Sequence, residues 1–335
     1  MLFSEKKIKN YIFKNRIVMA PMCMYQADNS GFVNEFHQTH YGARAIAGVG
    51  LVIVEATAVE ARGRITENDL QVSSDEHIPG LSKLAQNIKR FGSIAGIQIA
   101  HAGRKSNTTG EIIAPSAINF PKMKVPHEMT IKDINEVKQA FKDGARRINQ
   151  AGFDLIEIHA AHGYLINQFL SPLTNKRDDN YGGSKDNRLR FLSEIIDSIK
   201  EVWPSDKLLA IRFSATEYHE DGNNVGDIVY FINKLKDKGI DLINVSTGGV
   251  VPAEIELYPG YQLDYAKTIK QETNIPVIGG GLITTGKDAD SAIKNLGIDF
   301  IYFGRELLRN PHFPRSAALE LGVEFLVHPA YIRGK

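Results

Sequence analysis

Short apolar segments rich in β-branched residues recur along this chain of 335 residues, and helical patterns fill the intervals between them. The segments cover residues 17–21, 49–59, 93–101, 153–160, 208–214, 240–246, 275–279 and 298–304. Their hydrophobicity is continuous rather than alternating, which is typical of parallel strands covered on both faces. Strands that alternate with helices, expected here over 131–150, 187–202 and 225–238, predict a parallel α/β fold.

One five-residue pattern, Gly–apolar–Asp–apolar–Ile, occurs three times, beginning at Gly152, Gly239 and Gly297. A glycine just past a helix supplies the left-handed residue that ends it, and the next strand then begins. Three copies of this joint favour a closed (β/α)8 TIM barrel over an open sheet. No compositional break interrupts the chain, so we expect a single domain over residues 1–335 with its active site at the C-terminal face of the strands.

Composition and charge exclude several classes of protein. The formal net charge is +1, so no global field favours nucleic acid or an acidic membrane. Cys23 is the only cysteine, which excludes an intramolecular disulfide and a cysteine-based metal site. The sequence contains no apolar run long enough for a membrane span and no signal-peptide pattern at its start. We therefore expect a cytoplasmic protein without membrane or nucleic-acid partners.

Polar residues interrupt two apolar strands near the ends where barrel enzymes place their chemistry. Gln98 lies among Ile97, Ile99 and Ala100, and Arg212 lies between two apolar neighbours. A guanidinium inside such a strand needs an acceptor, because an unpaired buried charge is very costly. Either Glu157 on the preceding strand or a bound ligand satisfies this need, and the strand pattern leaves both open.

Two histidines and a tyrosine, His159, His162 and Tyr164, follow the end of the fourth strand. Two histidines three residues apart, with no third ligand nearby, do not predict a metal site. Two neutral imidazoles can instead donate hydrogen bonds to one substrate oxygen, with Tyr164 as an acid. We therefore expect a catalytic rather than a structural role for this group.

Glycines follow the last two strands, at positions 279–281 and at Gly304, which precedes Arg305. Loops at this position of a barrel commonly bind phosphate through backbone N–H groups, and an arginine adds two parallel donors. Turn geometry alone also requires glycine. The combination with Arg305 favours a phosphate site.

Four segments resemble the signature motifs of the old yellow enzyme family. They are NRIVMAPMCMY at 15–25, HAAHGY at 159–164, RDDNYGG at 177–183 and FGREL at 303–307. The resemblance extends over the whole chain in order. Cys23, Tyr25, the short length and the ending YIRGK resemble the compact, thermophilic-like bacterial branch of that family.

The resemblance implies tightly bound FMN, with NADPH or NADH as reductant. The residues that it places against the flavin or its phosphate are Ala20, Pro21, Met22, Cys23, Ala56, Gln98, Arg212, Gly280, Gly281, Gly304 and Arg305. Arg212 would lie near flavin N1 and the C2 carbonyl, which assigns it to the ligand without excluding a contact with Glu157.

The implied reaction reduces the activated C=C bond of an α,β-unsaturated carbonyl, or of a nitro compound, by hydride transfer from flavin N5. His159 and His162 would bind the substrate oxygen, Tyr164 would protonate the α-carbon, and Cys23 would tune the flavin. Tyr25 would cap the substrate. Arg333, in a tail over 325–335, would reach the active site of a neighbouring subunit, which requires a homodimer or homotetramer.

Two other functions explain part of the pattern. An RNA-modifying flavin barrel of the dihydrouridine synthase type needs a basic surface, which the net charge of +1 does not suggest. A flavin-free, phosphate-binding lyase or isomerase explains the glycines and Arg305 but not Gln98, Arg212 and the His–Tyr group.

Overall fold

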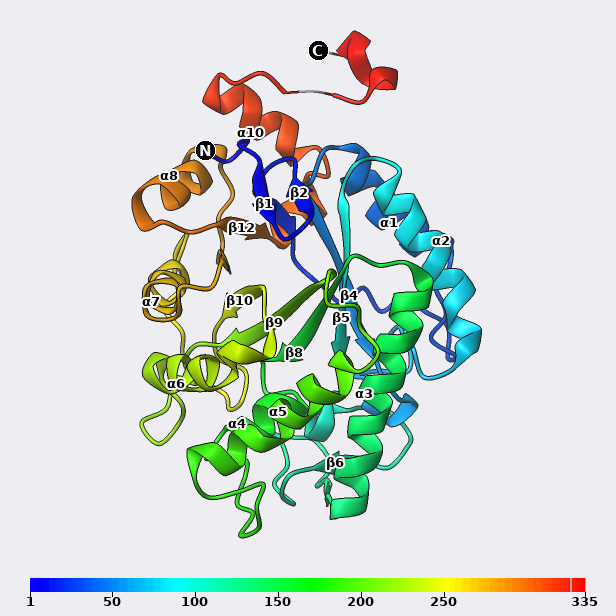
Figure 1. Ribbon diagram of the computed structural model, residues 1–335, viewed down its shortest axis with the longest axis vertical. Coiled ribbons are helices and arrows are strands. Elements are labelled where there is room, and N and C mark those ends of the chain that lie inside the picture. Colours follow the sequence, from blue (N-terminus) through cyan, green and yellow to red (C-terminus); the bar gives the residue numbers. More distant parts are fainter. Residues whose placement is uncertain (326, 335) are drawn as a thin grey trace.

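In a computed structural model that describes residues 1–325 and 327–334, eight parallel strands close into a barrel surrounded by helices (Figure 1). The strands of the barrel, in their order around it, are β3 (Ile17–Met19), β4 (Leu51–Ala58), β5 (Ile94–Ala100), β8 (Leu155–Ala160), β9 (Leu208–Ser214), β10 (Leu242–Ser246), β11 (Val277–Gly279) and β12 (Phe300–Phe303). Each lies within one of the eight apolar segments, so the expected TIM barrel is confirmed.

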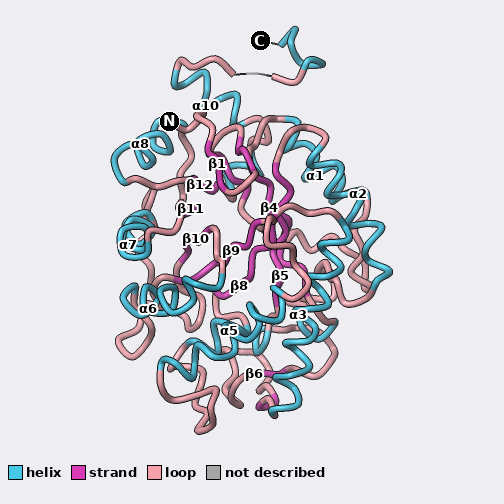
Figure 2. Tube along the Cα trace, in the orientation of Figure 1, coloured by secondary structure: helices cyan, strands magenta, loops and turns pink. Residues whose placement is uncertain are grey.

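Helices enclose the ring of strands on its outer side (Figure 2). They are α1 (Glu35–Ile46), α2 (Ile78–Lys89), α3 (Ile131–Ala151), α4 (Leu165–Leu170), α5 (Lys185–Lys200), α6 (Val225–Leu235), α7 (Leu263–Thr273), α8 (Gly286–Leu296), α9 (Arg305–Arg309) and α10 (Phe313–Leu321). Gly152, Gly239 and Gly297 have φ of +85°, +79° and +72°, so the expected left-handed joints are confirmed. None of the helices in the described residues is long and apolar enough to cross a membrane.

The N-terminal end of the barrel is closed by a hairpin of β1 (Lys6–Ile8) and β2 (Tyr11–Phe13). Phe13 packs against Phe300 with ring centroids 4.7 Å apart, inside a cluster that also contains Val18 and Leu51. This packing fills the interior of the barrel near the N-terminal ends of its strands. Space for a ligand therefore remains at the opposite end, where the strands run out into their loops.

Two features lie outside the barrel wall. A two-stranded ribbon of β6 (Ile113–Ala114) and β7 (His127–Glu128) belongs to the long loop after β5. The tail ends in a 3₁₀ turn over Pro329–Gly334 beyond α10 (Figure 1), where the Tyr331 ring lies edge-on to His312 at 6.0 Å. Arg333 is exposed on this turn. Residues 326 and 335 of the expected tail lie outside the described residues.

Candidate active site

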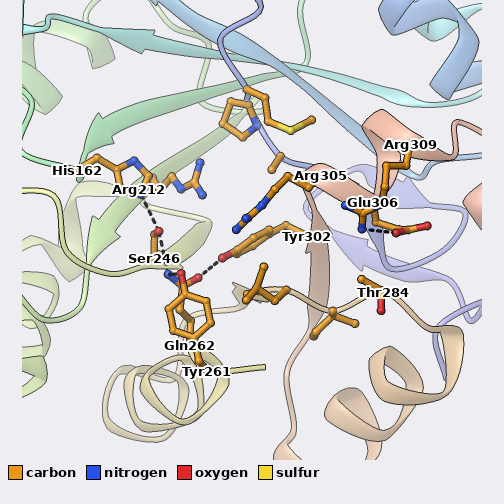
Figure 3. Close-up of a pocket in the computed structure, with 17 residues that line it drawn as sticks. His162, Arg212, Ser246, Tyr261, Gln262, Thr284, Tyr302, Arg305, Glu306 and Arg309 are labelled. Atoms are coloured by element: carbon orange, nitrogen blue, oxygen red, sulfur yellow. Dashed lines mark hydrogen bonds and ion pairs between the residues drawn. The ribbon is translucent and has the colours of Figure 1, made fainter. Parts of the chain in front are cut away.

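A cavity of about 320 Å³ lies at the C-terminal ends of the strands (Figure 3). The expected site residues that line it are Ala20, Pro21, Met22, His162, Arg212, Gly281, Gly304 and Arg305. These residues come from five different parts of the chain, and the barrel brings them together. Cys23 and Gly280 are sequence neighbours of lining residues, and Ala56, Gln98, His159 and Tyr164 lie on or just after strands of the same barrel.

One end of the cavity suits an anion. Arg305 lines the cavity beside Gly304 and forms no ion pair within 4.0 Å with any residue in the described ranges (Figure 3). Its neighbour Arg309, by contrast, is paired with Glu306 at 2.7 Å. A Cβ on Gly280 would lie 2.8 Å from the Tyr302 ring, so packing requires this glycine whether or not phosphate binds.

Arg212 has an unsatisfied donor. It is buried on β9, its guanidinium lies 5.4 Å from the centroid of the Tyr302 ring, and its Nε has no hydrogen-bond partner among the described residues. Glu157 is not its ion-pair partner, because no pair within 4.0 Å joins the two in the described part of the chain. The strand register explains this: Arg212 stands opposite His159, whereas Glu157 stands opposite Ala210, one layer deeper in the barrel.

The Glu157 carboxylate accepts hydrogen bonds from two side-chain amides instead. Its two carboxylate oxygens accept hydrogen bonds from Gln98 Nε2 and Asn244 Nδ2, each at 2.7 Å. Burial raises the pKa of this carboxyl group, and Arg212 opposes that rise. Gln98 thus donates one of its two amide N–H groups to Glu157. The Arg212 charge remains uncompensated by any direct ion pair and is available to a ligand.

The His159–Tyr164 segment forms a compact aromatic group after β8. The His159 ring lies perpendicular to those of His162 and Tyr164, with centroids 5.1 and 4.9 Å away. Ala161 N–H donates to His159 Nδ1 at 3.2 Å, which leaves the ring proton on Nε2, while His162 Nε2 lies 2.7 Å from Ser246 Oγ. Burial, reinforced by Arg212, lowers the pKa of both histidines well below 6.5, so both are neutral at pH 7.

Tyr164 keeps its proton. Burial raises the pKa of its phenol above the ordinary value of 10, with smaller contributions from Cys23 and Tyr25. A protonated phenol next to two neutral imidazoles can donate a proton and hydrogen bonds without taking up charge first.

The turn that carries this group is held against the loop after β10. His162 and Gly163 have φ of +59° and +71°, and a Cβ on Gly163 would lie 2.2 Å from the Gly249 carbonyl oxygen. Lys105 Nζ donates to the carbonyls of both His162, at 2.9 Å, and Gly249, at 2.6 Å. Lys105 therefore joins the two loops, and burial lowers the pKa of its ammonium to about 8.

With this geometry, comparison with known proteins is decisive. A family model described as "NADH:flavin oxidoreductase / NADH oxidase family" matches residues 1–323. The chain belongs to this family, that of old yellow enzyme. It is 54% identical over 336 residues to "NADPH dehydrogenase" of Geobacillus sp. (strain WCH70), covering 100% of this chain and 98% of that protein.

Solved structures agree on the fold. A 2-naphthoyl-CoA reductase complex superimposes with a TM-score of 0.90 at 28% identity, over 96% of this chain but only 52% of that longer one. The old yellow enzyme homologue from Zymomonas mobilis gives a TM-score of 0.83 at 24% identity, over 97% and 94% of the two chains. At that lower identity the likeness concerns the fold alone.

Membership in the old yellow enzyme family makes the chain a flavin-dependent oxidoreductase and argues against both alternative functions. The family implies FMN and a nicotinamide reductant, and the residues present fit FMN. The Arg212 Nε, which has no hydrogen-bond partner among the described residues, suits a flavin carbonyl or ring nitrogen, and Arg305, which has no ion pair among them, suits a phosphate.

Several lining residues were not among those predicted. Tyr302 donates a hydrogen bond to Gln262 Oε1 (Figure 3). Gln262 Nε2 in turn donates to Thr247 Oγ1 at 2.8 Å. Ser246 ends β10 and bonds His162. A polar residue at a strand end is a usable signal for Ser246. Gln262 lies just before a helix and offers no such signal.

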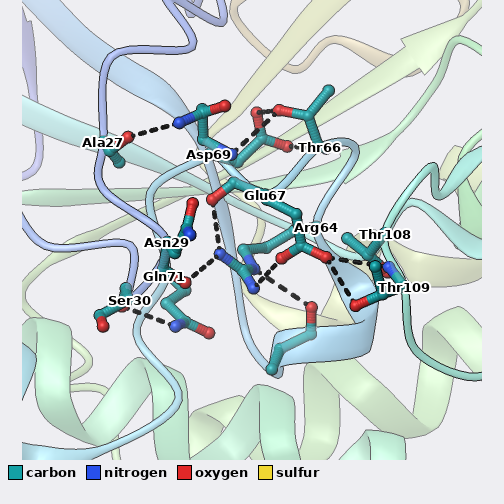
Figure 4. A network of polar contacts seen from close by, with 12 residues as sticks. Ala27, Asn29, Ser30, Arg64, Thr66, Glu67, Asp69, Gln71, Thr108 and Thr109 are labelled. Carbon is teal, nitrogen blue, oxygen red and sulfur yellow. Dashed lines mark hydrogen bonds and ion pairs between the residues drawn. The ribbon is translucent and has the colours of Figure 1, made fainter.

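A polar network joins three loops that follow strands of the barrel (Figure 4). Arg64 donates to the Asn29 carbonyl at 2.8 Å and to Glu67 Oε2 at 2.6 Å, and Glu67 Oε1 accepts from Thr109 N at 2.9 Å. The three loops that follow β3, β4 and β5 are thereby cross-linked. The first of these loops carries Cys23 and Tyr25, and Tyr25 is 46% exposed.

Proposed function

We propose that this chain is an FMN-dependent NADPH dehydrogenase that reduces the activated C=C bond of α,β-unsaturated carbonyl or nitro compounds. The observation that carries the proposal is the pair of neutral histidines beside a protonated tyrosine, next to a cavity lined by Arg212 and Arg305, neither of which forms an ion pair with another described residue. NADPH is preferred as reductant because the curated relatives are NADPH dehydrogenases.

The residues that hold FMN are assigned by position. The cavity-lining residues Arg305, Gly281 and Gly304, with Gly280, would bind the phosphate, and Ala20, Pro21 and Met22, with Cys23 and Ala56, would hold the ring. Arg212 and Gln98 contact its pyrimidine side. When bound, FMN would supply the hydride chemistry of the reaction, with NADPH as the source of the hydride.

The protein residues prepare the substrate for that hydride. His159 and His162 donate hydrogen bonds to the substrate oxygen, which polarises the alkene and stabilises the negative charge that develops on the oxygen. His162 exchanges its present contact with Ser246 for the substrate. The Tyr164 hydroxyl then gives its proton to the α-carbon, and Tyr25 covers the substrate from the mouth.

The tail completes the site in an oligomer. Arg333 lies on an exposed turn in the single chain, outside the cavity lining. We assign it to the active site of a neighbouring subunit in a homodimer or homotetramer, since a reciprocal exchange of tails requires at least two copies.

Purifying the protein tests whether it is an enzyme of the proposed class. The protein is expected to be yellow, to release FMN on denaturation, to be bleached by NADPH without oxygen and to regain its colour with cyclohexenone. A Tyr164→Phe variant serves as the matched control, because it retains the flavin and its bleaching but reoxidises slowly. A colourless protein that neither binds added FMN nor oxidises NADPH would overturn the proposal.

A further inference from the structure

Glu55 is a fully buried carboxylate at an irregularity in β4. Pairing with β5 is regular up to Val54 and resumes at Thr57, so Glu55 and Ala56 lie where the register shifts. Side chains satisfy the backbone there: Glu55 N–H donates to the Tyr41 hydroxyl at 2.9 Å, and the Thr57 hydroxyl donates to the Glu55 carbonyl at 2.9 Å. The irregularity is therefore a fixed feature that sets the position of Ala56.

The Glu55 carboxylate is anchored by hydrogen bonds rather than by a cation. Oε2 accepts from Met24 N–H at 2.8 Å and Oε1 accepts from the Tyr41 hydroxyl at 3.0 Å. No lysine or arginine among the described residues lies within 4.0 Å, and His37 Nε2, at 3.7 Å, is buried without a hydrogen-bond partner in the same set. Burying a carboxylate without a cationic partner costs free energy, which argues that Glu55 does more than fill space.

Met24 N–H belongs to the turn that carries Cys23 and Tyr25. Tyr25 has φ of +55°, a conformation that is strained for a tyrosine and persists only where its surroundings enforce it. The Met24–Glu55 hydrogen bond is one such restraint. Glu55 thus restrains two of the residues assigned to the flavin ring. It restrains Cys23 through the hydrogen bond to Met24, and Ala56 as its direct neighbour in the chain.

We propose that Glu55 is a positioning residue that holds the Cys23–Tyr25 turn at the flavin site and that its negative charge acts on the site through Cys23. The significance for catalysis rests on the proposed function. The contacts of Glu55 with Met24 and Tyr41 do not depend on it.

The titratable groups around Glu55 support an electrostatic role. His37 and Tyr41 face it from α1, Cys23 and Tyr25 from the turn, and Asp69 from the loop after β4. Burial raises the pKa of Glu55 to about 7. Burial, Asp69 and Glu55, in that order, raise the pKa of the Cys23 thiol. Removing the Glu55 charge should therefore lower the pKa of Cys23.

Alkylation of Cys23 tests this directly, because it is the only thiol in the chain. Iodoacetamide labelling, followed by intact mass as a function of pH, needs neither turnover nor an enone. Glu55→Gln keeps an acceptor for Met24 N–H without the charge, and Glu55→Leu removes both. Glu217→Gln is the matched control, since Glu217 is equally buried and hydrogen-bonded, to Ser171 and Asn223.

Above pH 7, where Glu55 is ionised, we expect Glu55→Gln to label faster than wild type, by about tenfold for each unit by which the thiol pKa falls. Glu55→Leu should in addition raise the KM for cyclohexenone, whereas Glu55→Gln should not. In the flavin-loaded protein, Glu55→Gln should shift the flavin reduction potential to a more positive value. Glu217→Gln should leave the labelling profile and the potential as they are.

Superimposable labelling profiles of wild type, Glu55→Gln and Glu217→Gln would overturn the inference, even if enone reduction is intact. A protein that fails to bind FMN would overturn the proposed function and leave the labelling result to stand by itself. If Glu55→Leu does not fold, labelling of Glu55→Gln still decides the question of charge.

Discussion

Replacing Gly163 by alanine tests the close contact that holds the His159–Tyr164 turn. An alanine Cβ there would lie 2.2 Å from the Gly249 carbonyl oxygen and 2.8 Å from Val250 Cα, both of them backbone atoms that no rotamer change can move away. Gly183 offers a matched control, because its φ of +74° resembles the +71° of Gly163 and a Cβ there would meet nothing within 4 Å.

The two substitutions separate backbone strain from overlap. Gly183→Ala should cost only the left-handed penalty, about 1 kcal/mol of unfolding free energy. Gly163→Ala carries the same penalty and also forces two backbone segments apart, which adds about 1–3 kcal/mol. We therefore expect a total loss of about 2–4 kcal/mol for Gly163→Ala.

Urea unfolding of FMN-loaded wild type and both variants measures these losses. Phenol binding, followed by the long-wavelength absorbance of the complex, reports on the site itself. It should weaken in Gly163→Ala, because separating the loops removes the two carbonyl acceptors of Lys105 and displaces His162. Equal losses of stability in the two variants, with unchanged phenol binding, would refute the steric reasoning.

Four further predictions follow from the site and its surroundings. Tyr164→Phe should slow reoxidation of the reduced enzyme by cyclohexenone by about 10²-fold and leave reduction by NADPH intact, whereas stopped-flow traces with the opposite pattern would refute it. Arg305→Met should weaken FMN retention by about 10–100-fold, as judged by ultrafiltration, since a hydrogen bond to a charged group contributes about 1.5–3 kcal/mol. Retention at the wild-type level would remove Arg305 from the phosphate site. Truncation before Tyr331 should weaken phenol binding or reduce the oligomer mass in sedimentation, and a fully active truncated monomer would exclude the shared site. Burial and Arg44 lower the pKa of His40 to about 4, so between about pH 6.5 and 4 the unfolded chain binds the extra proton. Stability should fall on acidification through this window, by up to about 1.4 kcal/mol per pH unit for this group, and less steeply in His40→Gln; parallel pH profiles of urea unfolding would contradict this.

The barrel was predictable because its signals are local. Continuous apolar segments marked every strand of the ring, and the three repeated glycines marked helix ends that no other residue forms as easily. The capping box of α3 is a local feature of the same kind, since Thr130 and Asp133 satisfy each other's backbone N–H groups within one turn.

The remainder of the site depends on contacts between distant segments, which carry no local signal. Lys105 acts through two backbone carbonyls, of His162 and Gly249, and any residue type could have supplied them. The contact expected as one possibility between Glu157 and Arg212 failed because register, rather than strand adjacency, decides which side chains meet. A sequence pattern indicates which strands are neighbours much more readily than it indicates their register.

Arg212 acts electrostatically on two parts of the site, the pair of histidines and the cavity for the ligand. Glu157 accepts hydrogen bonds from Gln98 and Asn244, and the strand register places it one layer deeper than Arg212, so the two do not form an ion pair. The positive charge that remains has two effects in the same cavity: it helps burial to keep His159 and His162 neutral, and it leaves a donor for a ligand that becomes negative. Neutral imidazoles donate to a carbonyl oxygen without competing for its proton, while the acid is supplied separately by Tyr164. An aspartate or glutamate paired with Arg212 would cancel both effects, and the strand register keeps Glu157 out of that position.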